Sequence, residues 1–260
     1  MSTLVKVENV NKQYRNGSTK ELFTSLKNVS LETDTNEFVC LLGPSGCGKS
    51  TLLKLISGLE KPDRGTITVD GTTVKKPQNN IGVVFQNYAL FPWRTVRKNI
   101  SIGLDINHVP KAQQKEKVDW AIKLVGLEKF AEYYPYQLSG GMKQRVAIAR
   151  ALVLDSKVLL MDEPFGALDA FTRMNLQDDL IELWQKQKFA AIFVTHDIDE
   201  AVYLADRVIV MTPSPGEIKK VFKIELARPR VRTSEDFNMY RSEILKQYGY
   251  TDNSYIEYQI

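Results

Sequence analysis

One short segment constrains this chain more than any other. Residues 43–50 read Gly-Pro-Ser-Gly-Cys-Gly-Lys-Ser, the pattern G-x-x-x-x-G-K-S, and Thr51 follows. The glycines allow several backbone N–H groups to face one anion, Lys49 adds a positive charge near β- and γ-phosphates, and the Ser50 hydroxyl can hold Mg²⁺. The apolar run 37–42 before the segment predicts a buried strand, and 51–57 after it predicts a helix. A strand, a glycine-rich turn and a helix N-terminus together predict a nucleotide phosphate site.

Composition narrows the class of protein further. The chain has 260 residues, enough for a sizeable core, and it contains no apolar run of about 18 residues that would span a bilayer. Its start has charges within the first apolar run, so we expect no signal peptide. We expect one of the two cysteines, Cys40 and Cys47, to be buried and the other to face phosphate, without a disulfide, as in a reducing cytosol. The 35 basic and 31 acidic residues are well mixed, and we expect no nucleic-acid partner.

Two further apolar runs end in polar residues that suit phosphate chemistry. Val158–Asp162 ends in a carboxylate, with Glu163 next, and acids at the carboxyl end of a buried strand lie at the ligand-binding edge of a sheet. In P-loop enzymes the first such Asp holds Mg²⁺, and Glu163 could polarise an attacking water. Residues 190–195 lead to His196, which could bond a terminal phosphate oxygen. A lone histidine is more often structural, but the end of a strand in the same sheet favours the functional interpretation.

A second glycine-containing segment, Leu138–Met142, opens a predicted helix. Ser-Gly-Gly before a helix can bind an anion, and Ser is also an ordinary helix cap. The pattern alone favours the cap, although two glycines leave the approach bare of side chains. Residues 110–125 also predict a helix, and we expect His108 in the preceding loop to be solvated and without function.

Aromatic and basic residues elsewhere allow two interpretations each. Tyr14 follows the alternating strand pattern of 5–10 and is either an edge aromatic or a plate on which a base stacks. The aromatics of 88–93 form either a local cluster under a loop or a docking surface. We expect the basic loop 228–232 to be a solvated surface, Thr233 to cap a following helix, and that helix to pack back on the body.

In order and spacing, these segments resemble the ATP-binding-cassette (ABC) ATPase subunits of transporters over nearly the whole chain. The resemblance implies an α/β P-loop NTPase with a mixed central sheet, an antiparallel β subdomain and an α-helical signature subdomain at about 87–155, all within an ATPase domain 1–220, followed by a C-terminal helical tail 221–260. It implies the cofactors ATP and Mg²⁺.

The resemblance also implies which residues form the site. The implied nucleotide-binding residues are Tyr14, Gly43, Pro44, Ser45, Gly46, Cys47, Gly48, Lys49, Ser50 and Thr51. The implied catalytic residues are Glu163, His196 and Gln86, with Ser50, Gln86 and (through water) Asp162 on the metal. Leu138, Ser139, Gly140, Gly141 and Met142 would be the signature acting in trans, and Asp169 the D-loop residue. Met142 is a departure from the family pattern, which usually has Gln at this position of the signature.

The resemblance also implies partners. The active unit of the family is a head-to-tail pair of cassettes, so we expect a second copy or a paralogous cassette, a transmembrane permease and, indirectly, a substrate-binding protein. The subunit would then be cytoplasmic, on the inner face of the cell membrane. Residues 91–96 and the motif starting at Arg228 resemble the nitrate/sulfonate/taurine branch of importers. An exporter subunit or a non-transport ABC ATPase on nucleic acid is the alternative; a P-loop kinase or GTPase would leave Leu138–Gly141 and His196 without a role.

Overall fold

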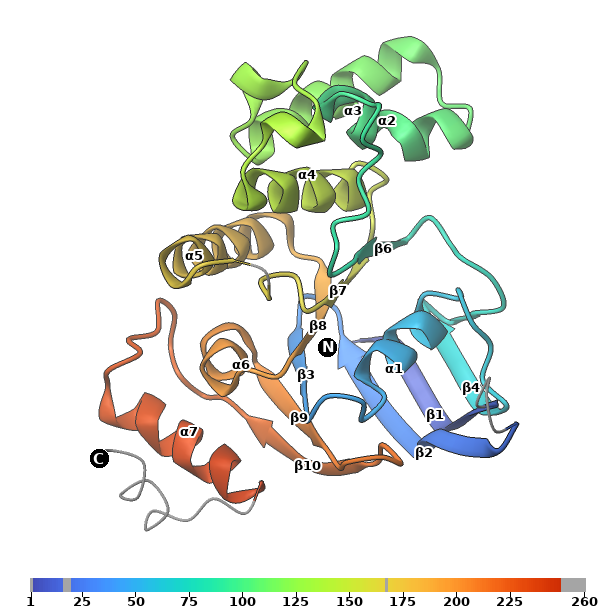
Figure 1. The fold of residues 1–260 in the computed structure, drawn as a ribbon, viewed down its shortest axis with the longest axis vertical. Helices are drawn as coiled ribbons and strands as arrows, with labels where there is room; N and C mark the ends of the chain where they lie inside the picture. Colours follow the sequence, from blue (N-terminus) through green and yellow to red (C-terminus); the bar gives the residue numbers. More distant parts are fainter. Residues whose placement is uncertain (1, 16–19, 167, 249–260) are drawn as a thin grey trace.

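The computed structural model describes residues 2–15, 20–166 and 168–248, which form two sheets and a separate group of helices (Figure 1). The larger sheet has six strands in the order β10-β9-β3-β8-β7-β6. Five of its strands are parallel to their neighbours, and β10 pairs antiparallel with β9. The strands are β3 (Phe38–Leu42), β6 (Ile81–Val84), β7 (Val158–Asp162), β8 (Ala190–Thr195), β9 (Arg207–Met211) and β10 (Ile218–Lys223).

The central strands are buried on both faces. All five residues of β3 and all six of β8 are buried, as expected for a parallel sheet covered by helices. One face packs with the helices α5 (Ala170–Gln187) and α6 (Ile198–Leu204). The other face packs on α1 (Lys49–Ile56) and the second sheet. The carboxyl ends of β3, β6, β7 and β8 therefore meet at one edge, where ligands bind in sheets of this kind.

The second sheet is antiparallel, with the order β2-β1-β4-β5. Its strands are β1 (Thr3–Arg15), β2 (Leu22–Asp34), β4 (Arg64–Val69) and β5 (Thr72–Thr73). Inward side chains of β1, such as Val5 and Val7, share one apolar cluster with Leu41 of β3 and Leu52 of α1. This sheet consequently packs against α1, and its strand β1 places Tyr14 near that helix.

Three helices form a layer with a core of its own. They are α2 (Val96–Ile106), α3 (Lys111–Leu124) and α4 (Gly140–Leu152), joined by the 3₁₀ turns η1 (Glu128–Phe130) and η2 (Pro135–Gln137). Side chains such as Ile100, Ile122 and Val146 fill the space between them. The sequence interpretation anticipated α3 and α4, but it missed α2, which begins three residues after the aromatic segment 88–93.

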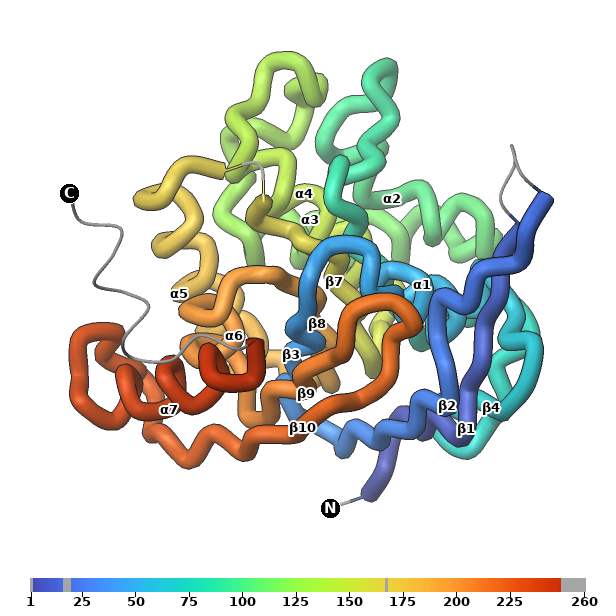
Figure 2. The backbone as a smooth tube through the Cα atoms, turned by 60° about the horizontal axis from the view of Figure 1, so that its bottom comes forward, coloured from blue at the N-terminus to red at the C-terminus, as the bar shows by residue number. Residues whose placement is uncertain are grey.

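The tail differs from the sequence interpretation in three ways. The expected boundary after residue 220 falls inside β10, which pairs with β9 and so belongs to the main sheet. The cap of helix α7 (Glu235–Lys246) is Ser234, whose hydroxyl accepts from the N–H of Phe237, and not Thr233. The basic loop is held in the structure rather than solvated, since Arg230 is only 6% exposed. Helix α7 does pack back on the body, against α6 (Figure 2).

Within the described ranges, no helix combines the length and the apolar character needed to cross a bilayer.

Candidate functional site

The P-loop backbone forms the floor of the site. Gly46 and Gly48 have φ values of 79° and 98°, a left-handed conformation that suits glycine. A Cβ on Gly48 would lie 2.6 Å from a methyl group of Leu26 and 2.9 Å from the Ser25 carbonyl, so this position also lacks room for a side chain. The Lys49 ammonium donates to the carbonyls of Gly43 (2.7 Å) and Pro44 (3.0 Å), which folds it back over the loop. A phosphate that enters the loop would replace these carbonyls as the partner of a buried positive charge.

Ser50 and Asp162 meet beside the loop although they are far apart in sequence. The Ser50 hydroxyl donates to Oδ1 of Asp162 at 2.8 Å. Burial raises the pKa of the Asp162 carboxyl, and the neighbouring Glu163 carboxylate raises it further. A hydroxyl and a carboxylate oxygen at hydrogen-bond distance are hard donors of the kind Mg²⁺ prefers, so the residues present fit this ion.

Glu163 and His196 form the second pair at the same sheet edge. His196 Nδ1 lies 3.2 Å from Oε2 of Glu163, and the two side chains come from the ends of β7 and β8. Glu163 has a left-handed φ of 43°, unusual for a residue with a side chain, and its N–H donates to the Val194 carbonyl. The Gln86 amide lies close by, since a Cβ built on Gly166 would be 3.9 Å from Gln86 Nε2 and 4.0 Å from Glu163 Oε2. The structure thus joins Glu163 to His196 directly and places Gln86 and Glu163 both next to Gly166.

Tyr14 is held beside the start of α1. Its hydroxyl donates to the carboxylate of Glu60, and its ring stacks on Phe23 with 5.7 Å between centroids. Burial, followed by the bond to Glu60, raises the pKa of Tyr14 to about 12. Sequence reasoning missed Glu60, which is an acid in the polar stretch after α1 and carries no motif.

The signature and D-loop residues cap helices. The Ser139 hydroxyl accepts from the N–H of Met142 at 3.3 Å at the start of α4, so the ordinary cap is present, and Gly141 is buried. Asp169 caps α5 by accepting from the N–H of Thr172 at 3.0 Å, and this bond lowers the pKa of the Asp169 carboxyl. Helix α4 lies in the helical layer, whereas α1 lies beside the sheets (Figure 1). One copy of the chain therefore does not bring Leu138–Met142 to its own P-loop.

Sequence reasoning also missed Arg150, which links helix α4 to the segment that follows Gln86. Arg150 of α4 donates to the carbonyls of Tyr88 (2.8 Å) and Ala89 (2.6 Å), both of which have left-handed φ values. Its guanidinium therefore fixes the chain directly after Gln86 to the helix that Ser139 begins. Its only sequence signal is a charged residue in the apolar second half of the helix, 146–152.

Cys47 does not face phosphate with its side chain, contrary to the sequence interpretation. Its side chain is 1% exposed and packs in the apolar cluster beneath the loop, and burial raises the pKa of the thiol. Cys40 is buried as well, and both cysteines are free. Only the backbone of Cys47 is therefore available to an anion. His108 is exposed in its loop, as expected.

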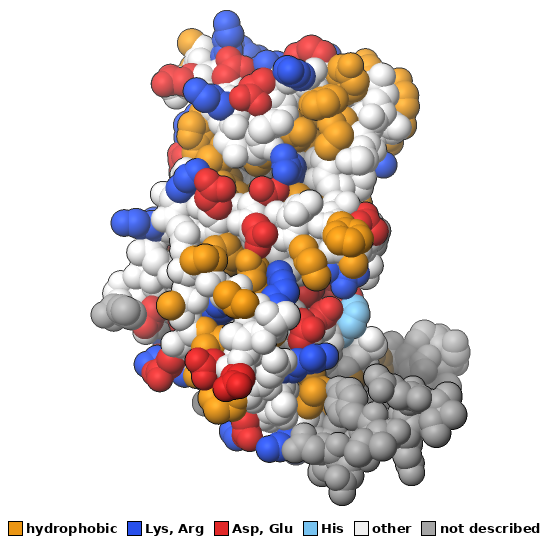
Figure 3. Space-filling view, turned by 90° about the vertical axis from the view of Figure 1, so that its left-hand side faces the viewer, with side chains coloured by type: hydrophobic (Ala, Val, Ile, Leu, Met, Phe, Trp, Pro, Cys, Tyr) orange, Lys and Arg blue, Asp and Glu red, His pale blue; other side chains and the backbone are white. Residues whose placement is uncertain are grey.

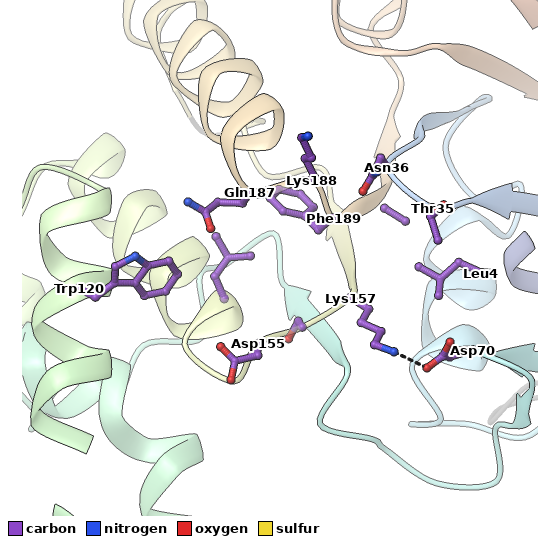
Figure 4. A pocket seen from close by; sticks show the side chains of 13 residues that line it. Leu4, Thr35, Asn36, Asp70, Trp120, Asp155, Lys157, Gln187, Lys188 and Phe189 are labelled. Atoms are coloured by element: carbon purple, nitrogen blue, oxygen red, sulfur yellow. Dashed lines mark hydrogen bonds and ion pairs between the residues drawn. The ribbon is translucent and has the colours of Figure 1, made fainter. Parts of the chain in front are cut away.

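A cavity of about 450 Å³ lies elsewhere, between the helical layer and the body (Figure 4). Trp120 of α3 lines one side, and the ion pair of Lys157 with Asp70 (2.6 Å) lines the other. None of the candidate site residues lines it, and Lys157, Asp70 and Asp155 of its lining are each held in an ion pair. The cavity therefore does not change the placement of the site at the carboxyl ends of the strands.

Comparisons with known proteins agree with this geometry. The family model described as "ABC transporter" matches residues 26–166, which include the P-loop, Leu138–Met142 and Glu163. The chain belongs to the ABC transporter family. It is 53% identical to an uncharacterized ABC transporter ATP-binding protein of Methanocaldococcus jannaschii, over 94% of this chain and 91% of that protein. It is 49% identical to the aliphatic sulfonates import ATP-binding protein SsuB of Bacillus subtilis, over 88% of this chain and 89% of that protein.

Solved structures show the same fold for this ABC cassette. A dimeric ATP-binding cassette in a post-hydrolysis state, bound to ADP and Pi, has a TM-score of 0.74 and 34% identity, covering 86% of this chain and all of that one. The α/β P-loop fold with its mixed sheet, antiparallel sheet and helical layer, predicted from the sequence, is confirmed. The chain is an ATP-binding ABC subunit and an ATPase.

Proposed function

We propose that this ABC subunit powers a membrane importer of small anions by hydrolysing ATP between two cassettes. The observation that carries the proposal is the contact of Glu163 with His196 at the sheet edge where Asp162 bonds Ser50 of the P-loop, with Gln86 and Glu163 both next to Gly166. The similarity to SsuB supports import of an organic sulfonate or a related anion. The dimeric cassette bound to ADP and Pi supports a pair of subunits.

The residues then take the following roles. The P-loop N–H groups and Lys49 hold the phosphates, and the ring of Tyr14 stacks on adenine. Glu163 accepts a proton from, or orients, the attacking water, and His196 fixes the γ-phosphate while it bonds Glu163. Ser50, Gln86 and, through water, Asp162 would hold Mg²⁺, which neutralises charge on the phosphates. Catalysis is therefore mainly positioning and charge neutralisation.

The second copy supplies the other half of the site. Ser139 and Gly141 lie at a helix N-terminus too far from the P-loop of the same chain to serve it, as the separation of α4 from α1 indicates. In a head-to-tail pair, Leu138–Met142 of one subunit would contact the γ-phosphate held by Lys49 of the other, with Asp169 at the seam. ATP would close the pair, and loss of phosphate would reopen it.

The helical layer would transmit this motion to a permease. Its face in Figure 3 presents hydrophobic side chains to solvent. Trp93 is 71% and Tyr136 is 75% exposed, and aromatic residues of this kind are enriched in protein interfaces. The subunit would thus sit at the cytoplasmic side of the membrane through the permease, and a substrate-binding protein would reach it only indirectly.

The variant Glu163→Gln tests the catalytic assignment. It should bind ATP within about threefold of the wild-type affinity, while kcat falls by about 100-fold or more, because the water loses its base. Glu182→Gln is the matched control, since Glu182 is an exposed acid on α5 paired with Lys186. The assignment is wrong if Glu163→Gln keeps half of the wild-type kcat.

The substrate class needs a separate test. In liposomes that contain the wild-type subunit with its permease and binding protein, an alkanesulfonate should stimulate ATPase activity. Stimulation only by unrelated substrates would reject the anion class.

A further inference from the structure

Arg232 lies in the loop between β10 and α7, and the proposed roles above do not use it. Its guanidinium lies over the ring of Tyr203, with 3.5 Å from Cζ to the centroid. Its Nη2 donates to Oε1 of Gln177 at 2.6 Å. Gln177 is on α5 and only 2% exposed, so a residue of the tail reaches a buried amide in the body of the molecule.

The amide of Gln177 continues to a buried carboxylate. Its Nε2 donates to Oε1 of Glu200 at 3.0 Å, and the Thr195 hydroxyl donates to Oε2 of Glu200 at 2.6 Å. Glu200 is 7% exposed, and burial raises the pKa of its carboxyl. A carboxylate in this position depends on its donors, because each lost bond leaves charge without compensation.

The same network fixes the residues on both sides of His196. The Thr195 hydroxyl accepts from the N–H of Asp197 at 3.0 Å, and Oδ1 of Asp197 accepts from the N–H of Glu200 at 3.1 Å. The backbone that carries the imidazole is thus held from Thr195 on one side and from Asp197 on the other. Only the imidazole itself is exposed, 3.2 Å from Glu163.

Arg173 extends the network toward the D-loop. Its Nη1 lies 3.5 Å from the Asp197 carboxylate, and its Nη2 donates to the carbonyl of Leu168, the residue before Asp169. The network therefore reaches two parts of the proposed site, the strand end at His196 and the start of α5.

Arg232 and Glu200 together fix which way the Gln177 amide points. A guanidinium has only donors, so Oε1 must face Arg232 and Nε2 must face Glu200. Without the guanidinium the amide loses one of the two bonds that select this orientation, and the donor to Glu200 is held less firmly. Buried networks of this kind act as units, so loss at one end is felt at the other.

We propose that Arg232 is a positioning residue for His196, acting through Gln177 and Glu200, so that ATP hydrolysis depends on the tail. The inference rests on the proposed role of His196. Since Arg232 contacts Gln177 and Tyr203 and none of the proposed nucleotide-binding or catalytic residues, its loss should change the geometry of the chemical step and leave ATP binding nearly intact.

Steady-state kinetics test this on the full-length dimer. Arg232→Ala should lower kcat about fivefold and change KM for ATP by less than about twofold, and Arg232→Lys should recover part of the loss. Gln177→Ala should have the same effect, and the double variant should be no worse than either single one, because both break one chain of bonds. Arg241→Ala is the matched control: Arg241 also joins the tail to α6, through an ion pair with Asp199 at 3.0 Å, but it lies outside the network, and kcat should be unchanged.

Histidine NMR separates positioning from general destabilisation. The chain has two histidines, and exposed His108 in the helical layer serves as an internal reference. In Arg232→Ala and Gln177→Ala the ring resonances of His196, assigned with His196→Ala, should shift while those of His108 stay in place. Unchanged kcat and unchanged His196 resonances in Arg232→Ala would overturn the inference, as would equal shifts of both histidines. If His196→Ala itself hydrolyses ATP at the wild-type rate, the proposed function is at fault instead.

Discussion

At the scale of single residues, the site contains charges that the fold would be more stable without. Asp162 is the clearest case, because burial and the nearby Glu163 carboxylate both raise the pKa of its carboxyl. A raised pKa means that the carboxyl contributes stability below its unfolded pKa and that this contribution is lost as the pH rises through the folded pKa. At pH 7 the ionised Asp162 therefore costs stability, as catalytic and metal-binding groups commonly do.

Asp162→Asn should consequently be more stable than the wild type at neutral pH while its ATPase activity is lost. The Asn side-chain oxygen can still accept from Ser50, and the buried charge is gone. We expect Tm of the nucleotide-free protein to rise by about 2–4 °C at pH 7 and the difference to shrink as the pH falls toward 4. Differential scanning calorimetry at pH 7 and at pH 4 measures the change in Tm and its dependence on pH. Asp169→Asn is the control of opposite sign, since the pKa of Asp169 is lowered, and it should not raise Tm. A lower Tm for Asp162→Asn at pH 7 would contradict the argument.

At the scale of elements, the tail closes an open helix end. Helix α6 ends at Leu204, and its last carbonyls have no partner within the helix. Arg230 Nη1 donates to the carbonyls of Val202 (2.5 Å) and Ala205 (2.6 Å), and Arg228 donates to that of Leu204 (2.6 Å). Desolvation, with the charge of Arg228, lowers the pKa of Arg230 to about 10. Cations at a helix C-terminus are also favoured by the helix dipole.

Arg230→Ala should therefore lower the free energy of unfolding by ~3 kcal/mol, because it leaves buried carbonyls without donors. Arg230→Lys should recover part of the loss through a single ammonium. Urea unfolding followed by circular dichroism measures the change, with Arg241→Ala as an exposed control expected to stay within about 0.5 kcal/mol. If Arg230→Ala lowers the free energy of unfolding by less than about 0.5 kcal/mol, water replaces the guanidinium as the donor to these carbonyls.

The elements also show which features a single sequence can predict. β3, β7 and β8 are short and apolar up to their last residue, and motif residues stand at or after their ends, so their positions and the shared sheet edge were predictable. Helix α5 was not anticipated, since its charged and apolar residues follow no motif, and α2 was hidden by the aromatics before it. The basic loop was misjudged because sequence shows charge but not the carbonyls of α6 that receive it. The Gln177–Glu200 bond joins residues whose contact depends on how α5 and α6 pack, which no local pattern reports.

At the scale of the whole molecule, the parts of the proposed site are divided between two regions. The P-loop, Asp162, Glu163 and His196 share one sheet edge, whereas Ser139 begins α4 in the helical layer. Two such chains arranged head to tail would form two composite sites, each with Lys49 from one chain and Ser139 from the other. A lone chain could hold ATP but would lack the second anion contact.

Mixing two inactive variants tests this division. In a pair of Lys49→Ala and Ser139→Ala chains, one composite site carries both lesions and the other carries none. Random pairing gives mixed dimers in about half of the population, with one intact site of two, so ATPase activity should return to about a quarter of the wild-type rate. Mixing Lys49→Ala with the double variant Lys49→Ala/Ser139→Ala is the control, because no pairing then yields an intact site. If Lys49 and Ser139 acted within one chain, neither mixture would recover activity, since every chain carries a lesion. Recovery only in the first mixture would establish that the P-loop is completed by a second copy.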